Sequence, residues 1–528
     1  MTEQAATPNP RVFSAFRFEC LACGAEVDEG DVRFVRSKAY SRRHRHGSAS
    51  KVATGAESDV VEISACPECG VRKGFLVEHV GEPLRSVVNA PPDAGEGEQP
   101  VVVDLFSGCG GLSEGFREAG FRVAAAVDVN PHMTRTFALN HPSCRVIAGD
   151  LRKLTTREVL GDEVGPRDVA AVVGGPPCQG FSTVGDRFAE DPRNRLFFEF
   201  LRVVREVDPP MFVAENVPGM LSMESGGVAA KVAEEFEQLG YAVAVRELNA
   251  VEYGVPQERR RVFFVGNKLG LPAESAFPEP TRAAPPACSK PKNGARANER
   301  VVLPLTSLLA GRPARTAAGG AGSDGRGTNC RAGTAQPGLQ PAVTVAEAID
   351  DLPPLNRGGD PGGFATGYSG PPRTEYQRAM RGDCQVLFNH ERPNHSPLVL
   401  KRIKALREGQ NHRDLPAHLK LSSGYPNIYG RLWRDRPATT VTGNYGCVSA
   451  PGRFIHPTVD RALTVREGAR LQSFPDDFVV VGSKSLQYRQ VGNAVPPLLA
   501  KALAARLLKL LKQTLMPRTT GERRDGSL

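Results

Sequence analysis

The chain has 528 residues, a length that fits about two to four domains. Hydrophobic residues make up 40% of it, enough for at least one large core. Lys and Arg outnumber Asp and Glu by 67 to 58, which fits a polyanion partner such as nucleic acid, although many soluble proteins are mildly basic. The sequence has no apolar run of about 20 residues and no secretory signal pattern, so we expect no membrane span and a cytoplasmic chain with reduced cysteines.

Residues 1–90 contain two CxxC pairs, each followed by Gly: Cys20 with Cys23, and Cys66 with Cys69. This paired spacing is typical of a zinc ribbon, and four thiolates would form a closed structural Zn²⁺ site. Two unrelated CxxC pairs, or a redox dithiol, are the alternatives. The sequence therefore predicts a zinc-ribbon-like domain over these residues, with extra DNA contact or protein docking as its role.

Residues 91–99 are polar and predict a linker, and the chain then changes character. Short apolar runs, at 101–103, 169–173, 211–213 and 262–265, alternate with segments of helical spacing. This alternation is typical of an α/β fold with a parallel sheet. We therefore expect a catalytic domain over residues 100–270.

Two segments of the expected sheet carry residues suited to a nucleotide-like ligand. The glycine-rich segment 104–111 follows the first apolar run, and glycines there let the backbone turn tightly and approach a ligand. Asp128 ends the next run and can hold ribose hydroxyls, while Asp150 could contact an adenine edge. The segment lacks the GxGxxG pattern, which counts against a nicotinamide cofactor.

Three further motifs point to chemistry at the carboxyl ends of strands. Cys178 lies in GGPPCQGFS after the run 169–173, where two prolines present its thiol rigidly. Glu215 and Asn216 follow the run 211–213, and parallel strands bring both ends to one rim. The segment QERRR, residues 257–261, precedes a strand. A buried structural cysteine, a solvated loop acid and an exposed charge cluster are the respective alternatives.

The C-terminal half divides by composition. Residues 272–345 are rich in Pro, Gly, Ala, Ser and Arg and predict a flexible insert within a region spanning 271–459. Residues 460–515 predict helices, including an amphipathic one at the end, and residues 516–528 predict a disordered tail.

The order FSGCGG, PPCQGFS, ENVPGM, QERRR and RQVGNAVP resembles the DNA cytosine-5 methyltransferase family. The shared motifs cover about 101–267 and 460–497. The resemblance implies a Rossmann-like mixed sheet that uses S-adenosylmethionine, a target-recognition region at 271–459, and a return of residues 460–515 to complete the catalytic domain. The N-terminal segment with its four cysteines lies outside this family pattern.

The resemblance also implies roles for single residues in methylating cytosine C5. Cys178 would attack C6 of a flipped-out base, because C5 alone is a poor nucleophile. Glu215 would contact the exocyclic amine and protonate N3. Arg259 would hold the base carbonyl and help position Glu215, with Arg261 beside it in the catalytic set. Asn216 would orient the neighbouring backbone.

The implied ligand contacts form two further sets. Residues expected to bind S-adenosylmethionine are Phe106, Ser107, Gly108, Gly110, Gly111, Leu112, Asp128, Asp150, Pro177 and Asn493. Residues expected to contact double-stranded DNA are Gln179, Ser182, Arg187, Gln257, Arg431, Thr440 and Thr442. We expect a monomer that modifies a specific DNA sequence in a restriction-modification or epigenetic system, with a cognate endonuclease as a further partner.

Two other functions compete with this interpretation. The same fold could methylate RNA cytosine, although the single PPCQGFS motif and the large recognition region favour DNA. The second alternative is a DNA-binding or defence scaffold without catalytic activity. The intact set of Cys, Glu and Arg residues argues against it.

Overall fold

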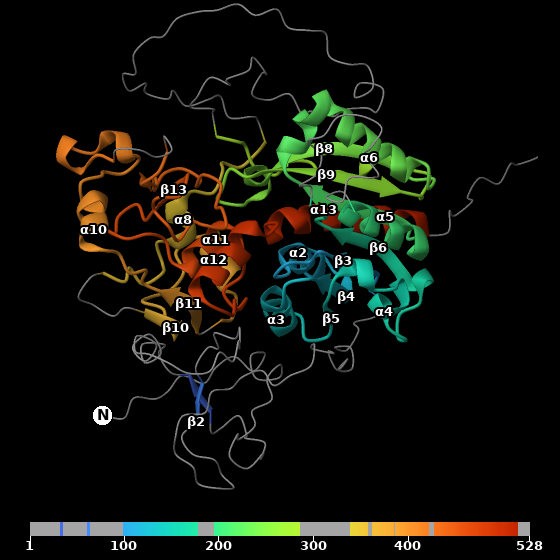
Figure 1. The fold of residues 1–528 in the computed structure, drawn as a ribbon, viewed down its shortest axis with the longest axis horizontal. Helices are drawn as coiled ribbons and strands as arrows, with labels where there is room; N and C mark the ends of the chain where they lie inside the picture. The colour runs from blue at the N-terminus through green and yellow to red at the C-terminus, as the bar shows by residue number, and fades with distance from the viewer. Residues whose placement is uncertain are drawn as a thin grey trace, which may run out of the picture.

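The computed structural model describes residues 32–34, 61–63, 99–177, 195–285, 338–356, 362–384, 386–421 and 427–515. Figure 1 shows these residues in two lobes, one built on a large sheet and one built mostly of helices and short strands. Among the described residues, no helix combines the length and apolar character needed to cross a membrane.

The sheet lobe is built on a seven-stranded sheet in the order β5-β4-β3-β6-β7-β9-β8. Its strands are β3 (Val101–Leu105), β4 (Arg122–Asp128), β5 (Arg145–Ala148), β6 (Val169–Gly174), β7 (Met211–Asn216), β8 (Ala242–Asn249) and β9 (Arg260–Asn267). The first five are parallel, whereas β9 runs antiparallel to both β7 and β8. The sheet is therefore mixed, and the four predicted apolar runs all lie in its strands.

Helices cover both faces of this sheet. The apolar side chains of α4 (Thr156–Leu160), α5 (Arg195–Val207) and α6 (Gly227–Glu237) share one core with the first face. Those of α2 (Gly111–Glu118), α3 (Pro131–Asn140) and α13 (Pro497–Leu515) share a second core with the other face. The predicted C-terminal amphipathic helix is thus α13, which packs on the sheet lobe beside α2.

The second lobe has its own core, formed by apolar residues between Val343 and Val491 together with Cys109. Its elements are α8 (Val345–Ile349), β10 (Gly362–Thr366), α9 (Glu375–Arg381), β11 (Leu387–Glu391), α10 (Pro397–Lys404), β12 (Gly430–Arg431), β13 (Arg453–Ile455), α11 (Val465–Leu471) and α12 (Lys484–Asn493). Strand β10 pairs antiparallel with β11, and β12 pairs parallel with β13. Residues 465–493 therefore join the second lobe before the chain returns to the sheet at α13.

The remaining elements are short. A separate antiparallel pair joins β1 (Val32–Phe34) to β2 (Val61–Ile63). The 3₁₀ helices are η4 (Leu151–Lys153), η5 (Pro166–Asp168), η6 (Pro218–Gly226), η7 (Ala250–Tyr253), η8 (Ala273–Ala276), η9 (His412–Asp414) and η10 (Ala417–Leu419).

The predicted insert at 272–345 includes ordered ends. Residues 272–285 are described and contain η8, where Ala276 and Phe277 are buried in the core of the sheet. On the far side, Gln340 bridges to Arg282 and Thr344 caps α8. Residues 272–285 were assigned to the flexible insert by their polar composition, but the buried side chains of Ala276 and Phe277 anchor them to the sheet lobe.

A buried charge network stabilises the second lobe around Arg470, whose side chain is 0% exposed. Its guanidinium donates to both carboxylate oxygens of Asp476, at 2.5 and 2.6 Å, and to those of Asp351, both at 3.2 Å. Tyr368 donates to Asp476 at 2.6 Å. Removing the cation would leave two buried carboxylates without their main partner.

Arg470→Met is therefore expected to lower the free energy of unfolding by about 3–5 kcal/mol, the usual cost of breaking a buried ion pair. Chemical denaturation measures the change. The matched control is Arg434→Met, since Arg434 pairs with Asp350 at the surface and its side chain is 49% exposed. That control is expected to cost about 1 kcal/mol or less. Equal losses in the two variants would contradict a special role for the buried network.

Candidate active site

The glycine-rich segment forms the loop between β3 and α2. Three of its residues have left-handed backbone conformations: Phe106 at φ 59°, Gly108 at φ 57° and Gly110 at φ 100°. The backbone N–H of Ser107 donates to the carbonyl of Val127 at 3.0 Å, which joins the loop to β4. Phe106 is not glycine, so its conformation is strained and is maintained by these surroundings. The loop is thus fixed at the carboxyl end of β3, before the first turn of α2.

Asp128 and the residue after it form the next part of the site. The Asp128 carboxylate accepts from the N–H groups of Gly108, at 2.9 Å, and Asn130, at 2.8 Å, and burial raises its pKa. Val129 projects outward with 70% of its surface exposed. Val129 was not among the predicted site residues, although its place directly after a strand-ending acid was a signal for it. Asp128 and Val129 thus present a carboxylate and an apolar surface side by side.

Asp150 lies at the end of the neighbouring strand, β5, where it caps η4. Its carboxylate binds the guanidinium of Arg152 at 2.6 Å, and this hydrogen bond lowers the pKa of Asp150. The glycine-rich loop, Asp128 and Asp150, all predicted to contact one ligand, therefore follow adjacent strands of the sheet, because β3, β4 and β5 are neighbours.

The chain after α12 packs directly on the glycine-rich loop. A Cβ atom built on Gly111 would lie 2.3 Å from the carbonyl oxygen of Val495, so only glycine allows this approach. Asn493, the last residue of α12, is exposed two residues earlier. Because Gly111 and Val495 are in contact, Asn493 lies near the glycine-rich loop although it is nearly 400 positions away in sequence.

Gly111→Ala is expected to force these two segments apart. Backbone atoms cannot move aside without a large energetic cost. We therefore expect the free energy of unfolding to fall by about 1–3 kcal/mol and the affinity for S-adenosylmethionine to fall by ~10-fold or more. Denaturation and calorimetry measure the two effects. Gly367→Ala serves as control, since nothing lies within 4 Å of its added Cβ. Unchanged affinity in Gly111→Ala would argue against this loop as the donor site.

Glu215 and Arg261 form an ion pair at the carboxyl end of β7. Arg261 Nε lies 2.9 Å from Glu215 Oε1, and each side chain is 15% exposed. A Cβ on Gly175 would lie 3.1 Å from Glu215 Oε2, so the carboxylate packs against the chain that leads to Cys178. Burial raises the pKa of Glu215, whereas Arg261 and Arg259 oppose this shift. The pair thus contains a carboxyl group that retains its proton to higher pH than an exposed glutamate.

Asn216 fixes the same strand end to the segment after β6. Its side-chain amide donates to the carbonyl of Pro176 at 3.1 Å, and its oxygen accepts from the N–H of Val217 at 2.9 Å. Pro177 is exposed beside it. Cys178 itself, with Gln179, Ser182 and Arg187, lies outside the described residues, as do Cys20, Cys23, Cys66 and Cys69.

Arg259 occupies a different environment from the one expected. It is 1% exposed and donates to three backbone carbonyls: Val441 at 2.9 Å, Gly492 at 3.1 Å and Ala494 at 2.9 Å. We call this set the Arg259 junction. The ion pair with Glu215 is formed by Arg261 instead, because the segment before β9 pairs with the second lobe through the bridge of Gln257 to Ala438.

Two of the residues predicted to contact DNA are buried, so these predictions were wrong. Gln257 is 0% exposed and binds Leu471, Gln472 and the N–H of Val441. Arg431 is 4% exposed, and its guanidinium donates to carbonyls of Ile403 and His456 and to the Asp460 carboxylate. Their bonded groups are satisfied inside the protein, and the remaining Nε of Arg431 is itself buried, so neither side chain offers a group at the surface to a base or phosphate.

Thr440 and Thr442 lie nearer the surface, and both are half-buried. The Thr440 hydroxyl donates to the carbonyl of Glu258 at 2.7 Å. The carbonyl of Thr442 packs against Gly492, where an added Cβ would lie 2.2 Å away. These residues therefore belong to the segment that joins the two lobes beside the Arg259 junction.

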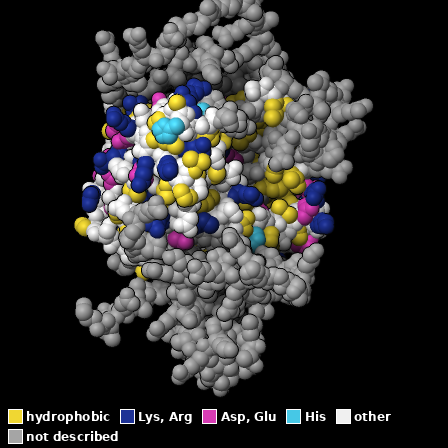
Figure 2. Space-filling model, turned by 60° about the vertical axis from the view of Figure 1, so that its left-hand side comes forward, with side chains coloured by type: hydrophobic (Ala, Val, Ile, Leu, Met, Phe, Trp, Pro, Cys, Tyr) yellow, Lys and Arg dark blue, Asp and Glu magenta, His cyan; other side chains and the backbone are white. Residues whose placement is uncertain are grey.

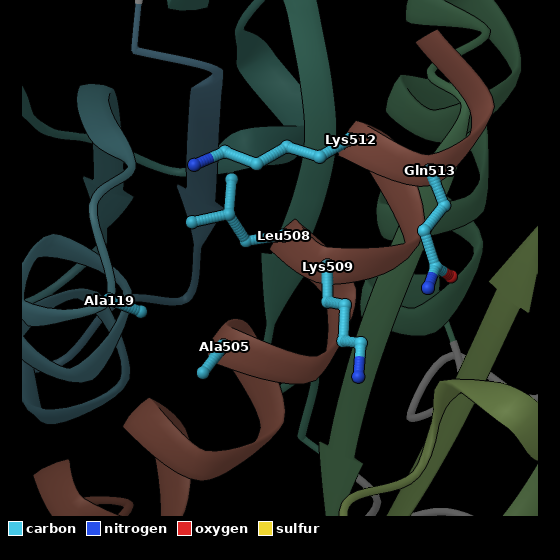
Figure 3. Close-up of a pocket in the computed structure, with 6 residues that line it drawn as sticks. All are labelled: Ala119, Ala505, Leu508, Lys509, Lys512 and Gln513. Carbon is cyan, nitrogen blue, oxygen red and sulfur yellow. The ribbon is translucent and has the colours of Figure 1, made fainter. Parts of the chain in front are cut away.

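A pocket on the sheet lobe lies away from these groups. It is formed by the last turns of α13 and the end of α2, as Figure 3 shows, and is lined by Ala119, Ala505, Leu508, Lys509, Lys512 and Gln513. It contains none of the candidate site residues. No cluster of potential metal ligands occurs within the described part of the chain.

Comparison with known proteins gives consistent matches. The family model of C-5 cytosine-specific DNA methylases matches residues 101–304 and 374–509. Type II methyltransferase M1.HphI of Haemophilus parahaemolyticus is 36% identical over 411 residues, covering 77% of this chain and 86% of that protein. Type II methyltransferase M.DdeI of Desulfomicrobium norvegicum is 34% identical over 427 residues, covering 77% and 88%.

A solved structure from E. coli, described as a prophage-encoded DNA modification methyltransferase, superimposes with a TM-score of 0.54 at 26% identity. It covers 78% of this chain and 99% of its own. The residues matched by the family model include the glycine-rich loop, the Glu215–Arg261 pair and Asn493.

Proposed function

Because the chain belongs to the C-5 cytosine-specific DNA methylase family, we propose that it methylates cytosine C5 in a specific double-stranded DNA sequence. The observation that carries this proposal is the Arg261–Glu215 ion pair, packed against Gly175 three residues before Cys178. A partly buried acid paired with a guanidinium, in contact with the chain that leads to a cysteine, suits addition to an electron-poor ring. The type II methyltransferases among the relatives support a restriction-modification role.

The residues at the carboxyl ends of β3, β4 and β5 fit S-adenosylmethionine. Ser107 Oγ is buried and has no hydrogen-bond partner among the described residues, which suits a polar ligand group. Asp128 would hold the ribose hydroxyls, and the exposed Val129 would pack on the adenine that Asp150 borders. The other proposed contacts are Phe106, Gly108, Gly110, Gly111, Leu112, Pro177 and Asn493. The bound cofactor supplies the methyl group that C5 accepts.

Side chains of this protein perform the other steps of the reaction. The Cys178 thiolate adds to C6, and a C–S bond forms. Glu215 donates its proton to N3, which neutralises the charge that the addition places on the ring. Arg261 orients Glu215 through their ion pair, a role that was expected of Arg259. After methylation, a base removes the C5 proton, the C–S bond breaks with release of the Cys178 thiolate, and N3 returns its proton to the Glu215 carboxylate.

Sequence recognition is assigned to the second lobe, within residues 271–459, and the target base is flipped out of the duplex. In Figure 2, turned so that this lobe comes forward, Lys and Arg side chains are scattered over the described part of the visible face, with Asp and Glu among them, and such cations can bind phosphates. Thr440 and Thr442 stay candidates for DNA contact, as do Gln179, Ser182 and Arg187. A cognate endonuclease, a monomeric state and a cytoplasmic location complete the proposal.

Structural Zn²⁺ at Cys20, Cys23, Cys66 and Cys69 is also proposed. Strands β1 and β2 lie between the two CxxC pairs in sequence, and their pairing sets Val32 opposite Ile63. This pairing brings the chain at residue 32 close to the chain at residue 63. It therefore supports one Zn²⁺ site shared by the two CxxC pairs.

The test is transfer of labelled methyl from S-adenosylmethionine to unmethylated duplex DNA, with transfer RNA in parallel. Bisulfite sequencing of the DNA locates the modified base. We expect label at cytosine C5 in one DNA sequence and none in RNA. Label in RNA alone would favour the RNA methyltransferase alternative. Absent label together with absent cofactor binding by calorimetry would favour the silent scaffold.

A further inference from the structure

Arg489 is an exposed cation on the face of α12 that carries Asn493. The two residues are four positions apart, so their side chains are neighbours on the helix surface. Both lie against Gly443: a Cβ there would be 2.9 Å from Asn493 Oδ1 and 3.5 Å from Arg489 Cγ. Arg489 therefore lies at the edge of the segment that follows Thr442.

This position is connected to the proposed catalytic groups through the Arg259 junction. Gly443 follows Val441 by two residues, and Val441 accepts from Arg259 in the Arg259 junction. The same junction binds the carbonyl of Gly492, on the helix that carries Arg489. Arg261, two residues after Arg259, pairs with Glu215. A short path of hydrogen-bonded backbone thus connects Arg489 to the target-base site.

The guanidinium of Arg489 has no ion-pair or hydrogen-bond partner within the described residues. The chain facing it also lacks carboxylates, since no Asp or Glu occurs between Asp435 and Asp460. Helix α12 contains none either. By contrast, Arg259 and Arg261 already have protein acceptors. Arg489 is a cation with its charge directed to solvent beside the site, which suits an anionic ligand.

We propose that Arg489 binds a backbone phosphate of the DNA next to the target cytosine, an inference that rests on the proposed function. The methionine carboxylate of the cofactor offers similar chemistry from another source. The cofactor loop contacts Val495, however, beyond Asn493. Arg489 lies one helical turn before Asn493, about 6 Å nearer the N-terminus of α12, on the side of the second lobe. This placement favours the DNA.

The experiment measures DNA affinity against salt concentration for the full chain and Arg489→Gln. Loss of one phosphate contact is expected to reduce the slope of log affinity against log salt by about 0.9 and to weaken binding on the order of 10-fold. Arg489→Lys keeps the charge and is expected to retain most of the slope. Affinity for S-adenosylmethionine, measured by calorimetry without DNA, is expected to stay unchanged in both.

Lys512→Gln is the matched control, because Lys512 is exposed near the far end of α13, about 22 Å along the helix from its first residue. It is expected to leave the slope unchanged. An unaltered slope in Arg489→Gln, or an equal fall in Lys512→Gln, would overturn the inference. If Arg489→Gln weakened cofactor binding and left DNA binding normal, Arg489 would instead bind the methionine carboxylate of the cofactor. Failure of the unmodified protein to bind or methylate DNA would count against the proposed function, separately from Arg489.

Discussion

Replacing Cys178 with alanine is expected to abolish methyl transfer to DNA, with a loss of at least ~10⁴-fold in rate. Cytosine C5 becomes reactive only after a nucleophile adds to C6, and the structure provides Glu215 and Arg261 beside the chain that leads to this thiol. An alanine leaves both groups in place but removes the bond-forming atom. Binding of S-adenosylmethionine, measured by calorimetry, is expected to remain normal.

Cys447→Ala is the control for this experiment, since Cys447 is a free and exposed cysteine in the second lobe. It is expected to keep full activity. Mass spectrometry of the unmodified protein with DNA containing 5-fluorocytosine adds a second readout, because a fluorine at C5 cannot leave as a proton does. A covalent protein–DNA adduct is expected, and it is expected to be absent from Cys178→Ala. Residual methylation in Cys178→Ala would exclude the thiol mechanism.

Glu215→Gln is expected to slow methyl transfer by ~10²- to 10⁴-fold, the usual contribution of a positioned general acid. Glutamine retains the shape and a hydrogen-bonding group but has no proton to give to N3. The matched control is Glu247→Gln, because Glu247 pairs with Arg260 on the adjacent strands at 2.8 Å and lies outside the site. Single-turnover rates with saturating DNA measure the effect. A Glu215→Gln enzyme as fast as the control would remove Glu215 from the mechanism.

The same variant carries a pH signature. The active form of Glu215 is the protonated one, and burial raises its pKa, so activity that depends on this proton falls as pH rises through the raised pKa. The Cys178 thiolate has the opposite requirement and gains with pH. The unmodified enzyme is expected to show a bell-shaped rate profile. Glu215→Gln is expected to lose the falling limb on the alkaline side.

The strands and the glycine-rich loop were predictable because their signals are local. Each apolar run became a strand, and the acids Asp128 and Asp150 lie at or just after the ends of β4 and β5 in sequence. Pairing between remote segments was not predictable. Gln257 is buried by contacts with Leu471 and Gln472, which lie more than 200 residues later in the chain. The sequence around position 257 does not predict these contacts. Its polar side chain therefore suggested a surface role.

Adjacent arginines posed the same difficulty. The QERRR segment gives no sign of which guanidinium contacts Glu215. The choice depends on the second lobe, which supplies the carbonyl of Val441 to Arg259 and leaves Arg261 for the carboxylate. Arg431 is buried by partners at least 25 positions away in sequence, among them the carbonyls of Ile403 and His456 and the Asp460 carboxylate. Burial of charged side chains is thus decided by tertiary partners that residue type alone does not reveal.

The Arg259 junction has a mechanical consequence for the entry of DNA. Its guanidinium comes from the sheet lobe, while the carbonyls of Val441 and Gly492 come from the chain of the second lobe. Pulling these segments apart would leave a buried cation without acceptors, which is costly. The two lobes are therefore fastened at this point, and they are joined a second time at α3, where Asn140 bonds to Val479 and Thr136 accepts from the N–H of Val481. Separating the lobes would break both attachments, so we expect them to keep their relative positions when DNA binds.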